Sequence, residues 1–194
     1  MRLLPQASRF PTIGAAMMIR FFQSVSLYAA LVLAPALVSV SGSAQAQEVK
    51  ALGTFGKWVA FTYTEKGKPV CYMSAKPDKS EGSYKARGEA LLLVTHRPAE
   101  KAFDVISMVA GYQYMPDSDA VVTAGGQTFR LFTNADRAWS RDAKTDAAVV
   151  QQLIKSSSAV IKGTSNRNTA TTDTFSLTGF GAAYKAIGDT CKKP

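Results

Sequence analysis

The chain contains only two cysteines, Cys71 and Cys191, and the second lies close to the C-terminus. If they form a disulfide, the C-terminal segment is tied back to the first third of the mature domain. Paired cysteines are usual in exported domains and rare in the cytoplasm. Two free thiols or a redox pair remain as alternatives, although the spacing is not the C-x-x-C of redox motifs.

Residues 1–46 have the features of a secretory signal peptide. Three arginines and no acidic residue precede an apolar run at 27–40. The run is followed by Ala44-Gln45-Ala46, an A-x-A cleavage site with small residues at the two positions that signal peptidase reads. A membrane anchor is the alternative, but the run is shorter than the roughly 20 apolar residues that a span needs. Translation from Met17 or Met18 would leave a shorter leader of the same kind.

Residues 47–194 have the size of one ordinary domain. Three of the 23 Lys and Arg residues lie in the leader and none of the 14 acidic residues does, so the net charge of this domain is +6. The positive charge is spread along the chain with no run of basic residues. A mildly basic exported domain is commonly just soluble, and the alternative is a preference for anionic surfaces such as lipopolysaccharide, acidic glycans or phospholipid headgroups. Nucleic acid is a poor partner, because no basic run is interleaved with aromatic residues.

We expect a domain in the periplasm or outer cell envelope, with no integral membrane span after signal cleavage.

The secondary-structure pattern is mainly β. Segments rich in β-branched and aromatic residues, separated by turns, predict strands at 55–63, 70–75, 89–97, 101–112, 120–123, 128–133, 159–162 and 172–177. One helix is expected to begin at Thr145 as its cap and to end near Ser156, and a second to span 180–187. Short strands at regular spacing favour an immunoglobulin-like β-sandwich with one or two short helices over a parallel α/β sheet.

His96 is the only histidine, so a Ser-His-Asp or Cys-His catalytic system would have to use it. No G-x-S-x-G motif accompanies it, and a lone histidine at a strand end is expected at the surface or at a sheet edge. One histidine also excludes the common histidine-rich zinc sites.

Two close pairs of carboxylates could serve hydrolysis of the glycosidase type: Asp117 with Asp119, and Asp142 with Asp146. The first pair lies in a predicted turn and the second near a helix start, where aspartate is common for structural reasons. We therefore predict no catalytic residue, no metal site and no cofactor. The alternative is an envelope hydrolase with an unrecognised active site.

Arg137, Arg141 and Arg167 form a possible anion or partner surface, with scattered surface charge as the alternative. Four aromatic residues could form a ligand shelf, although aromatics in strands mostly pack a core: Trp58, Trp139, Phe175 and Phe180.

Several motifs together resemble the invasion-associated locus B (IalB) family, most specifically in the C-terminal third. They are Trp58, Cys71, the F-x-L of 129–131, Ala138-Trp139 before an acid-capped helix, G-T-S-N-R-x-T at 163–169, T-x-D-T-F-S-L-x-G-F at 171–180, and Cys191. The resemblance implies an exported protein with an immunoglobulin-like β-sandwich and, for the best-known members, a part in host-cell invasion. It carries no catalytic residue. Asn168 stands where we expect glycine, and asparagine tolerates a left-handed backbone better than other non-glycine residues.

These features predict an exported, non-enzymatic binding module whose partner is a protein or an anionic component of the envelope or of a host surface. No sequence feature indicates an oligomeric state.

Overall fold

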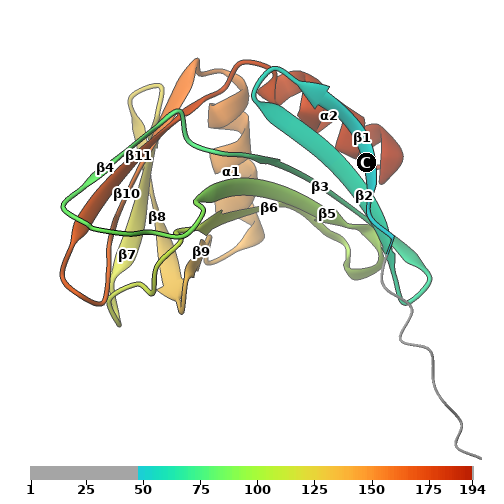
Figure 1. Cartoon of the computed structure of the whole chain (residues 1–194). Helices are drawn as coiled ribbons and strands as arrows, with labels where there is room; N and C mark the ends of the chain where they lie inside the picture. The colour runs from blue at the N-terminus through green and yellow to red at the C-terminus, as the bar shows by residue number, and fades with distance from the viewer. Residues whose placement is uncertain (1–47, 194) are drawn as a thin grey trace, which may run out of the picture. The chain divides into compact units, whose positions relative to one another are not determined.

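Eleven antiparallel strands form one sheet in the computed structural model, which describes residues 48–193 (Figure 1). The predicted signal peptide, residues 1–46, lies outside the described residues. The strands are β1 (Lys50–Phe55), β2 (Trp58–Glu65), β3 (Lys68–Ala75), β4 (Lys79–Gly82), β5 (Leu91–Arg97), β6 (Ala102–Val109), β7 (Asp119–Ala124), β8 (Gln127–Asn134), β9 (Arg137–Trp139), β10 (Ser158–Thr164) and β11 (Ala170–Ser176).

The sheet has two halves joined by the short strand β9. Its order is β1-β2-β3-β5-β6-β9-β8-β7-β10-β11-β4, so β1 and β4 are the edges. The first half comprises β1, β2, β3, β5 and β6, and the second half comprises β8, β7, β10, β11 and β4. In Figure 1 strands β1 and β2 lie to one side of helix α1 and the second half lies to the other. Buried apolar residues of both halves and of both helices belong to one core.

Helix α1 (Ala143–Ile154) packs against β6, and helix α2 (Phe180–Thr190) packs against β1, β2 and β3. The cap of α1 is Asp142, whose carboxylate accepts the backbone N–H of Thr145 at 2.8 Å, so the prediction that Thr145 caps this helix was wrong. Gly179 starts α2 at φ 90°, and a Cβ there would lie 1.9 Å from the carbonyl oxygen of Phe55, so only glycine fits this corner. Neither described helix is long and apolar enough to cross a membrane.

The predicted fold class is confirmed: residues 48–193 are mainly β with two α-helices, consistent with a β-sandwich-like fold. All eight predicted strands are present with shifted ends, and β5 and β6 form the expected antiparallel hairpin. Three strands were missed, β1, β4 and β9. The first contains a bulge at Gly53, the second is polar and fully exposed, and the third has three residues, so none carries a clear alternation of apolar residues.

A buried ion pair fixes the connection from β4 to β5, residues 83–90, which runs from one half of the sheet to the other. The two terminal nitrogens of Arg87 donate to the two carboxylate oxygens of Asp173 in β11, each at 2.7 Å. Arg87 Nε also donates to the carbonyl of Ala110 at 2.6 Å, and the hydroxyl of Ser80 donates to Asp173 at 2.7 Å. The side chains of Arg87 and Asp173 are only 5% and 2% exposed, so this pair is part of the interior.

A disulfide between Cys71 in β3 and Cys191 at the end of α2 supports the bridge predicted from the cysteine count. It holds α2 against the core face of the first half. There the ring of Phe180 meets that of Trp58 edge to face, with 4.8 Å between centroids.

Replacing both cysteines by alanine is expected to lower the free energy of unfolding by about 4–5 kcal/mol, because the bridge closes a loop of 120 residues in the unfolded chain. Urea unfolding of the double variant against the parent protein measures this. Intact mass before and after reduction provides the control, and a mass that does not rise by two hydrogens would contradict the bridge.

Arg87→Gln is expected to cost about 3–5 kcal/mol of stability, because it leaves the carboxylate of Asp173 buried without its counter-charge. The matched control is Lys79→Gln, which removes an exposed partner of Glu81 and should change stability by less than about 1 kcal/mol. Equal losses of unfolding free energy for the two substitutions in urea unfolding would show that the Arg87–Asp173 pair does not stabilise the fold more than an exposed pair does.

Candidate functional site

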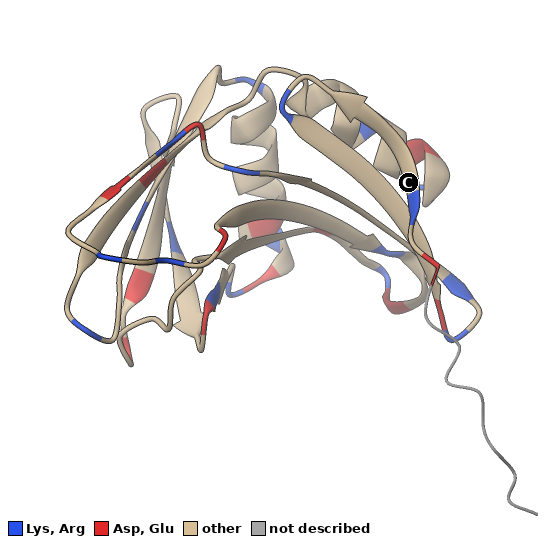
Figure 2. Cartoon of the chain, in the orientation of Figure 1, with Lys and Arg blue, Asp and Glu red and all other residues tan. Residues whose placement is uncertain are grey.

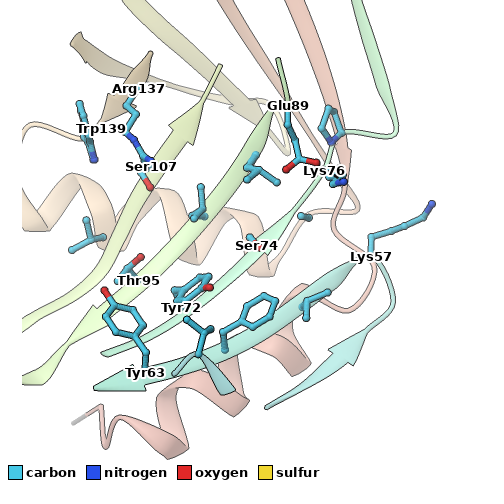
Figure 3. Close-up of a pocket in the computed structure, with 18 of the residues that line it drawn as sticks. Lys57, Tyr63, Tyr72, Ser74, Lys76, Glu89, Thr95, Ser107, Arg137 and Trp139 are labelled. Atoms are coloured by element: carbon cyan, nitrogen blue, oxygen red, sulfur yellow. Dashed lines mark ion pairs between the residues drawn. The ribbon is translucent and has the colours of Figure 1, made fainter. Parts of the chain in front are cut away.

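An open groove of about 900 Å³ lies on the face of the first half of the sheet that points away from the core (Figure 3). Strands β2, β3, β5, β6 and β9 form its floor. Its apolar and aromatic lining includes Val59, Phe61, Tyr63, Tyr72, Leu91, Leu93, Val105 and Trp139.

The strands of the groove carry many apolar residues on both faces. In β5, Leu92 and Val94 are fully buried in the core, while Leu91 and Leu93 point the other way and are half-buried in the groove. An antiparallel sheet with one face on the core normally places polar residues on the other face. The groove face therefore differs from an ordinary solvated face.

The second half of the sheet provides an internal comparison. Its outward positions are mostly polar, with Val121, Phe132 and Val160 as apolar exceptions; the polar ones are Thr123, Thr128, Arg130, Lys162, Thr172 and Thr174. The apolar outward face is thus a property of the groove strands and not of the whole sheet.

Four cations lie at the rim of the groove, and three have carboxylate partners. The pairs are Lys57–Asp78, Lys76–Glu89 and Arg97–Glu65. The fourth cation, Arg137 in β9, makes no ion pair or side-chain hydrogen bond with any of residues 48–193. Figure 3 shows its side chain directed toward Ser107 on the neighbouring strand β6. Arg137 is therefore the rim cation whose charge is not compensated within the described structure.

Aromatic rings form one end of the floor. Phe61 and Tyr72 stack with centroids 5.0 Å apart, and Tyr63 meets Tyr72 edge to face at 6.1 Å. Burial, followed by the neighbouring Tyr63, raises the pKa of Tyr72, so its hydroxyl remains protonated and able to donate a hydrogen bond. Arg97 donates to the hydroxyl of Tyr63 at 3.2 Å.

The three predicted surface arginines lie in different places. Arg137 lines the groove, while Arg141, just after β9, pairs with Asp119 at 3.0 Å. Arg167 lies in the turn between β10 and β11, where its backbone N–H donates to the hydroxyl of Ser165. No contact between described residues joins Arg167 to the other two, and a shared anion surface of all three stays a prediction.

Of the four aromatic residues proposed as a ligand shelf, only Trp139 lines the groove. Trp58, Phe175 and Phe180 are at most 1% exposed and belong to the core. Phe61, Tyr63 and Tyr72 were missed as candidates. Their signal was present in the sequence as alternate positions of β2 and β3, opposite the core-facing residues.

The four aspartates considered for hydrolysis each have a structural role: one forms an ion pair, one lies in a turn, one caps a helix and one accepts a backbone hydrogen bond. Asp119 pairs with Arg141, and Asp117 has φ 56° within the turn before β7. Asp142 caps α1, and Asp146 accepts the backbone N–H of Ile106 at 3.0 Å. Burial raises the pKa of Asp146. Within residues 48–193 no group of three His, Cys, Asp or Glu side chains is arranged to hold a metal ion.

His96 is fully buried on the core face, so the expectation of a surface or edge position was wrong. Its Nδ1 accepts the backbone N–H of Asp104 at 3.1 Å, at a point where the β5–β6 register shifts and Asp104 adopts φ 61°. The imidazole thus replaces a missing ladder partner. The carboxylate of Asp104 accepts hydrogen bonds from Tyr184 and Lys193, which join this cluster to the C-terminus.

These observations define a mainly antiparallel β domain with a disulfide-anchored C-terminal helix and an apolar groove on one half of its sheet. The chain belongs to the invasion-associated locus B family: the family model described as "Invasion associated locus B (IalB) protein" matches residues 58–188, which include all five groove strands. Comparisons with curated proteins and with solved structures found no match.

Stability is expected to fall as the pH drops below about 6.5, because burial lowers the pKa of His96 in the folded protein. Below that pH the unfolded chain binds a proton that the folded one does not, so up to about 1.4 kcal/mol is lost per pH unit until the folded pKa is reached. His96→Gln keeps an acceptor for the Asp104 N–H without titrating. Urea unfolding at pH 7.5 and 5.5 should show a smaller difference in this variant than in the parent, and equal differences would refute the assignment.

Proposed function

We propose that this protein is an exported, non-enzymatic binding module of the cell envelope, which uses the groove to bind an apolar ligand or partner. The observation that carries the proposal is the apolar outward face of the groove strands, beside a mostly polar outward face in the same sheet. Covering half-buried leucine, valine and aromatic side chains releases water from apolar surface, and full burial of such a side chain is worth about 1.5–3 kcal/mol.

The chemistry of the lining favours binding over turnover. Side-chain hydroxyls of Ser74, Thr95 and Ser107 lie among the apolar residues, and the carboxylates at the rim, Asp78 and Glu89, pair with lysines. General acid–base catalysis uses a titratable group within hydrogen-bond reach of the reacting atoms. His96 lies on the opposite face of the sheet and bonds to the backbone of Asp104.

The proposed location is the periplasm or the outer cell envelope. The leader at residues 1–46 and the disulfide support it, since disulfides persist in oxidising compartments. The family description associates such proteins with an invasion locus, and a role in host-cell invasion is one setting in which the binding module could act.

Site-specific photocrosslinking in live cells tests the proposal. A photoreactive phenylalanine analogue at Tyr72, on the groove floor, should capture a defined adduct. The same analogue at Arg130, on the outward face of β8, is the matched control and should capture little. Equal capture at the two positions, or none at Tyr72, would contradict a binding groove. If the protein turned over a glycan, ester or peptide and Ser107→Ala abolished that turnover, the binding proposal would be wrong and the hydrolase alternative would be supported.

A further inference from the structure

The groove floor is a continuous track that crosses the strands. Residues directly paired across five strands form one row: Trp139, Ser107, Leu93, Ser74 and Val59. The next row, across four strands, is Val105, Thr95, Tyr72 and Phe61. Since neighbouring strands lie about 4.8 Å apart, the distance from Ser107 in β6 to Val59 in β2 is about 14 Å. An elongated apolar ligand fits along this track.

The backbone of the floor offers no hydrogen-bonding edge. Each of the five groove strands has a paired strand on both sides, because β1 flanks β2 and β8 flanks β9. An extended peptide on the floor would bury its own N–H and C=O groups without partners, which costs about 1–3 kcal/mol for each group. An acyl chain has no such groups.

A second copy of the chain is a poor occupant. Among residues 48–193 the strongly exposed large apolar side chains are Val49 and Ile154, and Val49 itself lines the groove. The described surface therefore presents no protruding apolar cluster that would fill the groove of a neighbour.

The uncompensated positive charge at the rim favours a ligand with an anionic head group. Lysine and arginine side chains elsewhere on the rim are compensated by carboxylates, whereas the guanidinium of Arg137 is not. Arg137 is directed toward Ser107 at one end of the track (Figure 3). A guanidinium beside a hydroxyl offers several donors to a carboxylate or phosphate.

We propose that the ligand is a single-chain anionic amphiphile: an acyl chain with a carboxylate or phosphate head. Arg137 and Ser107 bind the head, and the chain lies over Leu93 and Val105 toward β2. The inference rests on the proposed binding function of the groove and names the chemistry of its ligand.

Calorimetric titration of the purified protein with dodecanoate, dodecyl phosphate and dodecanol, each below its micelle concentration, tests the assignment. Both anions should bind at one site per chain and at least about tenfold more tightly than the alcohol, because hydrogen bonds to a charged group are among the strong ones. Each methylene added to the carboxylate should tighten binding about two- to fourfold. The fluorescence of Trp139 should change on binding, while Trp58, fully buried, should not respond.

Arg137→Gln should weaken dodecanoate and dodecyl phosphate about tenfold or more and leave dodecanol unchanged. Arg130→Gln, which removes an exposed cation from the outward face of β8, is the matched control and should change none of the three. Unfolding curves of both variants should overlay that of the parent, since neither side chain is buried.

Equal affinity for the anions and the alcohol, or an Arg137→Gln variant that binds the anions as the parent does, would overturn the inference. Binding to phospholipid vesicles with none to the monomeric amphiphiles would also overturn it, in favour of a membrane surface. If the amphiphiles fail while Tyr72 captures a protein in cells, this assignment is wrong and the proposed function stands. If Tyr72 captures nothing and the amphiphiles fail, both are wrong.

Discussion

The ion pair between Arg87 and Asp173 is the interaction on which the arrangement of the sheet depends. Burying two charges is costly unless the geometry is close to ideal and the remaining donors and acceptors are satisfied. Here the pair is bidentate, the third guanidinium donor reaches the carbonyl of Ala110, and Ser80 donates to the carboxylate. The ring of Tyr112 lies 5.0 Å from the guanidinium carbon. The pair fixes where the chain leaves β4 and where β5 begins, and β5 is the central strand of the groove floor.

The disulfide and the His96 cluster act at the other end of the same strands. Cys71 pairs in register with His96 across β3 and β5, so the bridge to Cys191 and the hydrogen bond to Asp104 stabilise one region from two sides. Helix α2, held there, covers the core face of β1, β2 and β3. Because α2 already covers the core face of these strands, the apolar residues on their outward face are not needed to form the core. The apolar side chains of the groove floor are half-buried, which limits the exposed apolar surface.

Much of the fold could be predicted from the sequence, because apolar alternation and turn residues act locally. The eight strands that were found all carry one of these signals, and Asn168 adopts φ 59°, the left-handed conformation expected where a glycine was missing. The missed elements depend on the tertiary structure. The polar strand β4 is a strand because Asp173 and its neighbours in β11 offer it an edge. His96 was misplaced for a similar reason, since the irregular residue that needs its imidazole lies on another strand. The groove was missed because aromatic residues in strands were expected mostly to pack a core.

The charge distribution clarifies how such a groove would distinguish its ligand. Figure 2 shows basic and acidic residues intermixed along the strands and loops. At physiological ionic strength charges are screened over about 8 Å, so a scattered net charge of +6 attracts anions only weakly and without selection. A single uncompensated guanidinium at the border of an apolar track acts differently. Tight binding there requires both direct contact of the anion with the guanidinium and burial of the attached chain on the track. A free anion lacks the chain, and a neutral chain lacks the anion. In the proposed complex, selectivity therefore arises from the position of Arg137 relative to Leu93 and Val105, and not from the total charge of the domain.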